Sequence, residues 1–134
     1  MEKEFIKEIL HSVTLNITAG KIDSFRELEK TSGTVRVYDH GCIGIAGCLG
    51  EPDEEELTEK AQQALAFGIH YPCRMEGPLT LEDLREEEII RTSEFIPAMQ
   101  DFLDRLARLC PEFAFSNKIS LTYNRSEYRN SAGR

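Results

Sequence analysis

The three histidines and four cysteines are the residues best suited to bind a metal or to move a proton. They are scattered along the chain, and His70 and Cys73 form one of the few close pairs. A zinc site needs several such ligands in a tight cluster, so an ordinary loop is the better interpretation of this pair. The sequence therefore predicts no metal site and no cofactor in this chain. His11 and His40 are expected at exposed positions, and the cysteines as free thiols in a reducing compartment.

The sequence motifs of several enzyme classes are absent. There is no Gly-rich phosphate loop, no His-Glu-x-x-His and no Gly-x-Ser-x-Gly. The chain has 24 acidic residues, but the runs at 54–56 and 86–88 are typical of solvated helix faces. Without geometry they do not identify a pair of catalytic carboxylates. We therefore expect no catalytic residue here, and an unrecognised acid–base site is the remaining enzymatic alternative.

Composition and charge narrow the class of protein. A chain of 134 residues fits a single domain, and 40% hydrophobic residues can form a core. A net charge of −8 disfavours nucleic acid and anionic membranes as partners, because both would repel the protein. No apolar run is long enough to span a membrane, and the first residues lack the apolar core of a signal peptide. We therefore expect a cytoplasmic protein.

Residues 33–48 predict a β-hairpin with close packing on one face. Val35 and Val37 occupy alternate positions, as in a half-buried strand, and the turn at 39–41 contains a glycine that tolerates positive φ. The return strand carries Gly, Ile, Ala and Gly at 44–47, so one of its faces has almost no side chains. A helix or a bound backbone is expected to approach that face closely.

Other segments show the alternation of strands: 13–17, 21–31 and 119–123. A helix is the alternative for 21–31, which is rich in helix formers, but the short turn at 19–20 favours a hairpin. Residues 2–10 have apolar side chains at helical spacing and predict a helical turn or a frayed terminus.

Two main helices are predicted. The first begins at Asp53, an N-cap with Glu56 positioned to complete a capping box, and ends at Gly68. The second runs from a cap at Thr92 or Ser93 to about residue 110 and places Pro97 in its first turn. Its wide apolar face is typical of a core helix, and a coiled-coil seam is the alternative. A short helix is also expected around 80–88.

The C-terminal region predicts a turn at 124–126, after which a new strand begins and soon stops. We therefore expect that the chain is a domain excised from a longer protein. The order of strands, helices and strands predicts an α+β fold with a largely antiparallel sheet of about five or six strands. The two main helices are expected to pack on one face of this sheet.

Four segments together resemble one protein family. Residues 15–24 resemble its opening hairpin, residues 32–46 its Gly-rich core hairpin, residues 53–65 its first helix, and residues 128–133 a strand containing Asn-Ser-x-Gly. The family is TldD/PmbA, once called modulators of DNA gyrase and now regarded as metallopeptidases that mature or degrade small peptides. The resemblance spans nearly the whole chain but only the N-terminal domain of the family.

The resemblance implies a non-catalytic, N-terminal domain of a metal-dependent peptidase. The metal-bearing members hold their metal, expected to be zinc, on a His-Glu-x-x-x-His helix in a later region, and this chain lacks that motif. No metal ligand or catalytic residue therefore transfers to it. The resemblance does not distinguish the metal-bearing from the metal-lacking type, identify a substrate, or establish a link to gyrase.

In the family the N-terminal domain helps to shape a cleft for an extended peptide, and subunits pair as homodimers or heterodimers. The resemblance thus implies cleft walls at 33–48 and in the strands from 118, with a strand edge that pairs with the peptide backbone. Candidate peptide contacts are Arg36, Tyr128 and Asn130. The alternative is that Arg36 only pairs with surface acids and that Asn130 only makes a turn.

A free-standing peptide- or protein-binding module without enzymatic activity is the alternative function. A reading frame that continues past residue 134 with His-Glu-x-x-x-His would favour the peptidase domain, and a stop codon there would favour the module. Hydrolytic or transferase activity of the isolated chain would favour the enzyme with its own site.

Overall fold

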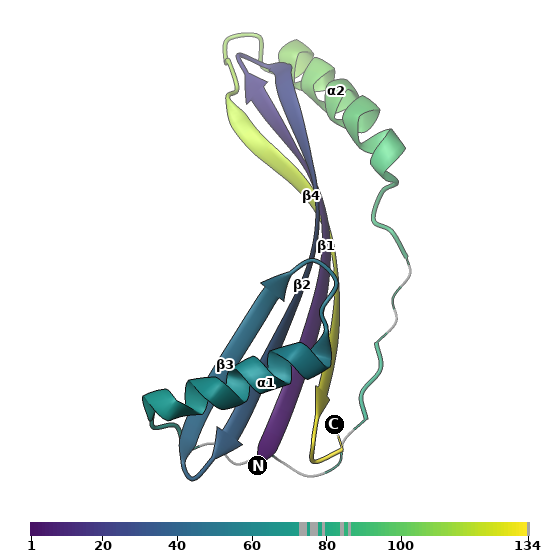
Figure 1. The fold of residues 1–134 in the computed structure, drawn as a ribbon. Coiled ribbons are helices and arrows are strands. Elements are labelled where there is room, and N and C mark those ends of the chain that lie inside the picture. Colours follow the sequence, from purple (N-terminus) through teal and green to yellow (C-terminus); the bar gives the residue numbers. More distant parts are fainter. Residues whose placement is uncertain (73–74, 76–77, 79, 84, 86, 134) are drawn as a thin grey trace. The chain divides into compact units, whose positions relative to one another are not determined.

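The computed structural model describes residues 1–133 apart from 73–74, 76–77, 79, 84 and 86. The fold is α+β, as predicted, and its elements appear in Figure 1. In chain order they are β1 (Glu2–Thr18), β2 (Lys21–Asp39), β3 (Cys42–Leu49), α1 (Glu54–Ala64), the 3-10 turn η1 (Leu65–Phe67), α2 (Thr92–Leu109) and β4 (Asn117–Asn130).

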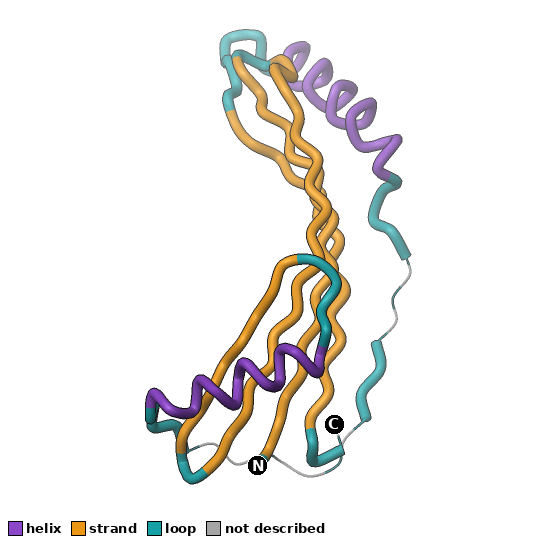
Figure 2. The backbone as a smooth tube through the Cα atoms, viewed as in Figure 1, coloured by secondary structure: helices purple, strands orange, loops and turns teal. Residues whose placement is uncertain are grey.

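The described strands form one antiparallel sheet of four strands in the order β3-β2-β1-β4. β2 and β3 pair from Ser32 opposite Leu49 to Asp39 opposite Cys42. β4 lies antiparallel to β1, because the Ser131 amide donates to the Lys3 carbonyl at 2.9 Å while the Gly20 amide donates to the carbonyl of Phe115. The described residues do not form the predicted five or six strands, because β2 and β4 each include two of the segments that the sequence pattern delimits (Figure 2).

Two mergers explain the difference in strand number. The predicted strand 21–31 and the first strand of the 33–48 hairpin are both part of β2, and no turn separates 124–126 from the residues that follow in β4. Residues 2–10 are the first half of β1, not a helical turn. β1 is flanked by β2 on one side and β4 on the other, so its backbone groups find partners in both neighbours. That pairing outweighs the helix propensity of its Glu and Lys residues.

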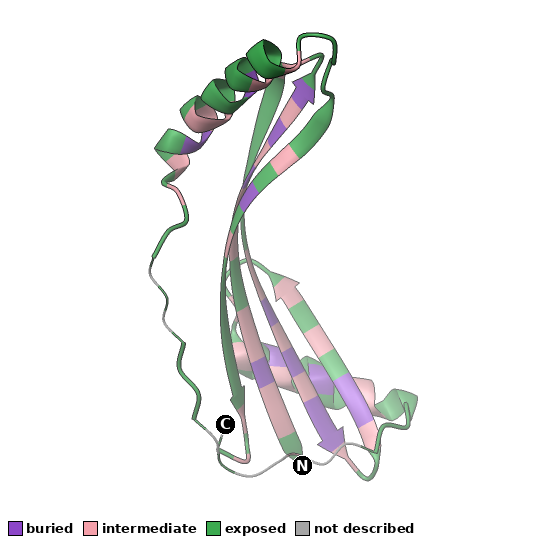
Figure 3. Ribbon diagram, turned by 180° about the vertical axis from the view of Figure 1, so that it is seen from behind, coloured by how far each residue is buried: buried purple, intermediate pink, exposed green. Residues whose placement is uncertain are grey.

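Contacts divide the chain into two compact units, each of which includes parts of β1, β2 and β4. Unit 1 comprises Met1–Leu10, Lys30–Asp83 and Asn124–Arg134, and unit 2 comprises His11–Glu29 and Leu84–Tyr123. Among the described residues, each unit has one α-helix and its own hydrophobic core. Buried positions alternate with less buried ones along the strands (Figure 3).

In unit 1, α1 packs on β2 and β3. The core consists of Phe5, Val35, Val37, Leu57 and Ala61. A side chain on Gly44 would place its Cβ 1.9 Å from the carbonyl oxygen of Ala61, so the helix backbone occupies the space that glycine leaves. The predicted close approach to this glycine-rich strand is therefore confirmed, and the partner is a helix.

The ends of α1 also agree with the prediction. Asp53 is the N-cap, and its Oδ1 accepts hydrogen bonds from the amides of Glu55 and Glu56 at 3.0 and 3.1 Å. The side chain of Glu56 pairs with Lys60 and does not complete a capping box. After η1, Gly68 adopts a φ of 63°, the left-handed conformation that commonly ends a helix.

In unit 2, α2 packs on β1 and β4 through a core of Val13, Leu15, Phe95 and Leu121. The predicted cap is wrong: Arg91 holds the N-cap position and its side chain makes no capping bond. Because α2 begins at Thr92, Pro97 is its sixth residue and lies in the second turn, not the first. The helix there lacks the hydrogen bond that an amide at this position would donate.

Both strand-to-strand turns are tight, as predicted. Ala19 and Gly20 have φ values of 49° and 77°, and His40 and Gly41 have 49° and 73°. Positive φ at both central residues matches the twist of the flanking strands.

The short helix expected around 80–88 is absent from the described residues of that range, and Leu84 and Glu86 lie outside them. Across the described residues, none of the helices combines the length and apolarity that crossing a membrane requires.

Candidate functional site

A cluster of polar side chains lies on the face of the unit 1 sheet opposite α1. Glu4 is at its centre, with 12% of its side chain exposed. Its Oε2 accepts a hydrogen bond from the Tyr38 hydroxyl at 2.8 Å, and its Oε1 accepts one from the Tyr128 hydroxyl at 2.7 Å. Arg36 Nη1 lies 3.7 Å from Glu4 Oε2, and Asn130 Nδ2 donates to the Tyr128 oxygen at 3.3 Å. One shielded carboxylate thus organises residues of β1, β2 and β4.

The three predicted site residues, Arg36, Tyr128 and Asn130, all lie in this cluster. Their contact with a peptide stays a prediction. The alternative is that Arg36 only pairs with acids and that Asn130 only makes a turn. Both features are present, because Arg36 faces the acid Glu4, and Asn130 Oδ1 accepts a hydrogen bond from the Ala132 amide at 3.0 Å. The Nε of Arg36 is buried without a hydrogen-bond partner among the described residues.

Sequence reasoning missed Glu4 because it interpreted residues 2–10 as helical. A signal was present, since Phe5 has the odd-numbered phase of Val13 and Leu15, the buried residues of the same strand. Extending that phase to the start of β1 places Phe5 toward α1 and Glu4 on the opposite face.

We call the sheet face opposite α1 in unit 1 the open face. Its β3 residues alternate with those that face α1, and they pair in register with β2: Ile45 with Arg36, Gly47 with Thr34 and Leu49 with Ser32. Ile45 is 53% exposed and Leu49 is 77% exposed. The open face therefore continues from the Glu4 cluster to apolar side chains on the edge strand.

β3 is an edge strand without a single charged residue between Cys42 and Leu49. β4, the other edge, carries Lys118, Arg125, Glu127 and Arg129. Proteins usually place charges, proline or bulges on edge strands, because unpaired backbone groups beside apolar side chains invite pairing with another chain. By this criterion the edge at β3 is open to an added strand and the edge at β4 is protected.

The chain itself pairs with the first part of the β3 edge. The Ile43 amide donates to the Ile69 carbonyl at 2.9 Å, and the Tyr71 amide donates to the Gly41 carbonyl at 2.8 Å. The Tyr71 ring then lies 5.9 Å from the Tyr38 ring. Because strand residues alternate, Ile45 and Gly47 direct their backbone groups outward like Ile43. Within the part of the chain that the structure describes, no segment pairs with them on that side.

On the other face, the first turn of α1 holds an acid between two bases. Glu54 Oε1 lies 2.9 Å from Lys3 Nζ, and its Oε2 lies 2.9 Å from Arg129 Nη2. The guanidinium of Arg129 also lies 4.8 Å above the centre of the Phe5 ring. The hydrogen bond from Lys3, with the positive charges of Lys3 and Arg129, lowers the pKa of Glu54, although partial burial opposes the shift. The carboxylate ties α1 to β1 and β4.

Replacing Glu54 with Gln is expected to lower the free energy of unfolding by roughly 1 kcal/mol at neutral pH. Because the pKa of Glu54 is lower in the folded protein than its ordinary value of 4.5, the carboxylate adds stability at pH values above 4.5. This stability is lost as the pH falls through the pKa of the folded state. The difference between Glu54→Gln and the original protein should therefore shrink in acid. Urea unfolding over a pH series measures it.

Glu55→Gln is the matched control, because Glu55 also lies in the first turn of α1 and loses the same favourable interaction with the helix dipole. A Glu55→Gln variant as destabilised as Glu54→Gln at every pH would contradict the role of Lys3 and Arg129.

Among the described residues, one group in unit 2 resembles a set of metal ligands. It consists of His11, Glu27 and Glu29, each of which has one possible ligand atom within 4.8 Å of those of the others. His11 Nε2 lies 2.8 Å from Glu27 Oε1, so these two side chains already satisfy each other. Both glutamates are exposed. Of the cysteines, Cys42, Cys48 and Cys110 are free, and Cys73 lies outside the described residues.

We expect the chain to hold no zinc in stoichiometric amount. Water competes with exposed side chains for the metal ion, and His70 with Cys73, interpreted as an ordinary loop, offers too few ligands for a structural site. Metal analysis by mass spectrometry after exhaustive dialysis measures this. One tightly held ion per chain, lost in His11→Ala, would contradict the prediction and locate the site.

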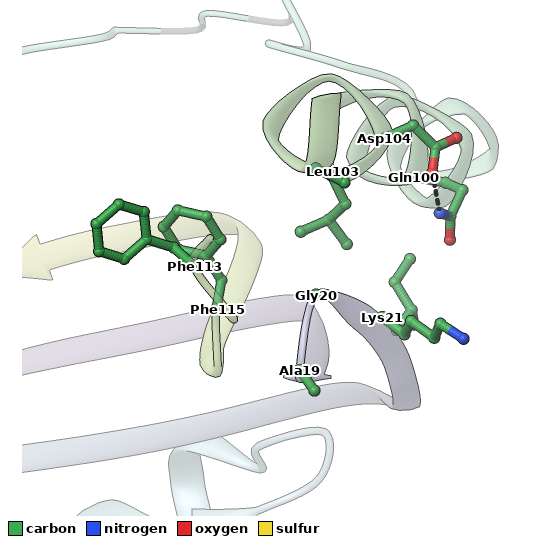
Figure 4. A pocket seen from close by; sticks show the side chains of 10 residues that line it. Ala19, Gly20, Lys21, Gln100, Leu103, Asp104, Phe113 and Phe115 are labelled. Atoms are coloured by element: carbon green, nitrogen blue, oxygen red, sulfur yellow. Dashed lines mark hydrogen bonds between the residues drawn. The ribbon is translucent and has the colours of Figure 1, made fainter. Parts of the chain in front are cut away.

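Unit 2 contains a cavity of about 420 Å³ between α2 and the 19–20 turn (Figure 4). Leu103 reaches in from α2, and the rings of Phe113 and Phe115 lie on one side. Two of its polar side chains are engaged with each other, since Gln100 Nε2 donates to Asp104 Oδ1 at 3.0 Å, and Lys21 also lines it. The cavity therefore combines apolar surface with a few polar groups. None of its residues was predicted as a site.

Comparison with known proteins finds a likeness of fold. No protein-family model matches the chain, and no curated protein matches its sequence. The crystal structure of a protein from Thermotoga maritima superposes on it with a TM-score of 0.76. That protein is a proposed modulator of a DNA gyrase. The two sequences are 11% identical, so the likeness to the gyrase modulator shows the fold alone.

The likeness covers 99% of this chain and 32% of the gyrase modulator. The chain thus spans about a third of that protein's length. Modulator of DNA gyrase is also the former name of the family that four short segments of this chain resemble. The superposition supports that resemblance at the level of the fold, and activity and partners remain to be proposed.

Proposed function

We propose that this chain is a non-catalytic peptide-binding domain, equivalent to the N-terminal, substrate-cleft domain of a TldD/PmbA-type metal-dependent peptidase. The observation that carries the proposal is the edge of the sheet at β3. This strand has no charged residue, and it exposes the side chains of Ile45 and Leu49. After Ile43, no other described segment pairs with its outward backbone groups. The likeness of fold to a gyrase modulator three times as long supports the part of the proposal that makes this chain equivalent to one domain of a longer protein. The partner is an extended peptide or a strand of a paired subunit.

Strand addition explains why the edge has this composition. An added strand would satisfy the outward amides and carbonyls of Ile45 and Gly47, and it would cover the apolar side chains of Ile45 and Leu49. The pairing of Ile69–Tyr71 with Gly41–Ile43 provides an example of the same geometry within the chain. The nearby Glu4 cluster adds the guanidinium of Arg36, whose side chain is 43% exposed, as a donor for side chains of the bound peptide.

Peptide binding is tested with a fluorescein-labelled peptide of alternating Thr and Val residues, measured by fluorescence anisotropy. The same peptide with N-methyl groups on alternate amides is expected to bind at least about tenfold more weakly, because it loses backbone hydrogen bonds. Hydrogen exchange of the Ile45 and Gly47 amides should slow in the complex. Equal binding of both peptides, or exchange that stays unchanged, would overturn strand addition at β3.

Ile45→Lys adds to the β3 edge the kind of charge that β4 carries, and it is expected to weaken binding about tenfold. Ser126→Lys, which adds the same charge to exposed β4, is the control and should bind as the original does.

The peptidase half of the proposal is tested separately in the native gene. A downstream His-Glu-x-x-x-His supports a catalytic parent, and its absence from a longer frame supports a metal-lacking partner subunit.

A further inference from the structure

The open face of β3 has a gap between two apolar side chains. Ile45, Gly47 and Leu49 share this face, and Gly47 contributes no side chain. A Cβ at Gly47 would lie 3.3 Å from the Gly33 carbonyl oxygen and 3.6 Å from Thr34 Oγ1, so backbone and a threonine form the floor of the gap. We call the space above Gly47, between Ile45 and Leu49, the Gly47 notch.

A peptide strand added to β3 would place one of its side chains directly beside the notch. Cross-strand neighbours on one face lie about 5 Å apart, and diagonal neighbours about 7–8 Å apart. The peptide residue opposite Gly47 would therefore contact Ile45 and Leu49 on its two sides. A large apolar side chain would fill the space, a small one would leave it open to water, and a charged one would be desolvated between two apolar groups.

We propose that the Gly47 notch selects extended peptides with a large apolar residue, such as Leu or Phe, at the position that pairs with Gly47. This inference rests on the proposed function and adds the class of peptide that the edge prefers. The intramolecular pairing at the other end of β3 follows the same pattern, since Tyr71 brings an aromatic ring against Tyr38 on the open face.

The test uses a panel of fluorescein-labelled peptides with one variable residue at the centre of a Thr-rich host and a Lys at each end. The central residue is Leu, Phe, Ala or Asp, so the single apolar side chain sets the register. Anisotropy titrations are expected to give dissociation constants about tenfold lower for Leu and Phe than for Ala, with Asp weaker than Ala.

The double variant Ile45→Thr and Leu49→Thr removes both apolar walls while keeping side chains that favour strands. It is expected to bind all peptides of the panel within about threefold of one another, because no apolar wall remains. Leu28→Thr changes an exposed leucine of β2 outside unit 1 and should keep the preference.

Each outcome decides between the two proposals. If the Leu, Phe and Ala peptides bind equally well, the notch is not selective, although strand addition stands. If the double variant keeps the preference, the apolar side chain binds elsewhere and the inference is wrong. If no peptide of the panel binds, the proposed function fails and the inference fails with it.

Discussion

Replacing Gly44 with alanine is expected to lower the free energy of unfolding by roughly 3 kcal/mol, the upper range for overpacking a core. The new Cβ would lie 1.9 Å from the Ala61 carbonyl oxygen and 3.0 Å from the Leu65 nitrogen, both of them backbone atoms. Neither can rotate away as a side chain would. α1 must therefore shift from β3 or the strand must bend, and either change separates packed residues of the unit 1 core. Urea unfolding followed by circular dichroism measures the loss.

Gly47→Ala is the matched control, because it adds the same methyl group three residues away on the same strand. Its Cβ would approach a carbonyl oxygen no closer than 3.3 Å, and the residue is exposed. We expect a change within about 1 kcal/mol. If Gly44→Ala proved as stable as Gly47→Ala, the close contact between β3 and α1 would be wrong.

Replacing Leu15 with alanine is expected to cost about 2–5 kcal/mol of unfolding free energy. Leu15 is 0% exposed and lies with Val13, Phe95 and Leu121 in the core of unit 2. Removing most of its side chain loses the free energy of its burial and leaves a cavity between β1 and α2. Thermal unfolding and urea unfolding both report the change.

Leu109→Ala, at the end of α2, makes the same substitution on a side chain that is 79% exposed. It should change stability by less than about 0.5 kcal/mol. The sequence pattern places Leu109 beside the apolar stripe of α2, so this comparison also tests which residues of that stripe are in the core. A loss at Leu109 similar to that at Leu15 would contradict the observed packing.

Local chemistry explains which parts of the fold are predictable. The glycines at 20, 41 and 68 act through their own backbone, and the Asp53 side chain caps amides two and three residues away. Turns and helix ends can therefore be placed from a few adjacent residues. The glycine-rich face of β3 even predicts close packing, because missing side chains leave a space that a neighbour must fill. The helical spacing of apolar side chains misplaces residues 2–10, since their strand depends on pairing with β2 and with β4, which is far away in the sequence.

The candidate site is less predictable for the same reason. Arg36, Tyr128 and Asn130 come from a family resemblance, and only tertiary structure reveals that Glu4 holds them together. The β3 edge is similar, because an uncharged strand is unremarkable in sequence until the sheet order makes it an edge. The group of His11, Glu27 and Glu29 also arises from strand pairing and has no sequence motif.

The position of β1 between β2 and β4 has a consequence for how the protein assembles. β1 and β2 are joined by a two-residue turn and can pair as soon as both have been synthesised, whereas Lys3 reaches Ser131 across 128 residues. Contacts of such long sequence separation form slowly, because closing the loop costs chain entropy before the pairing compensates for it. During synthesis β1 therefore exposes an unpaired edge until β4 leaves the ribosome. In that interval the nascent chain is most open to chaperone binding and to pairing with other strands.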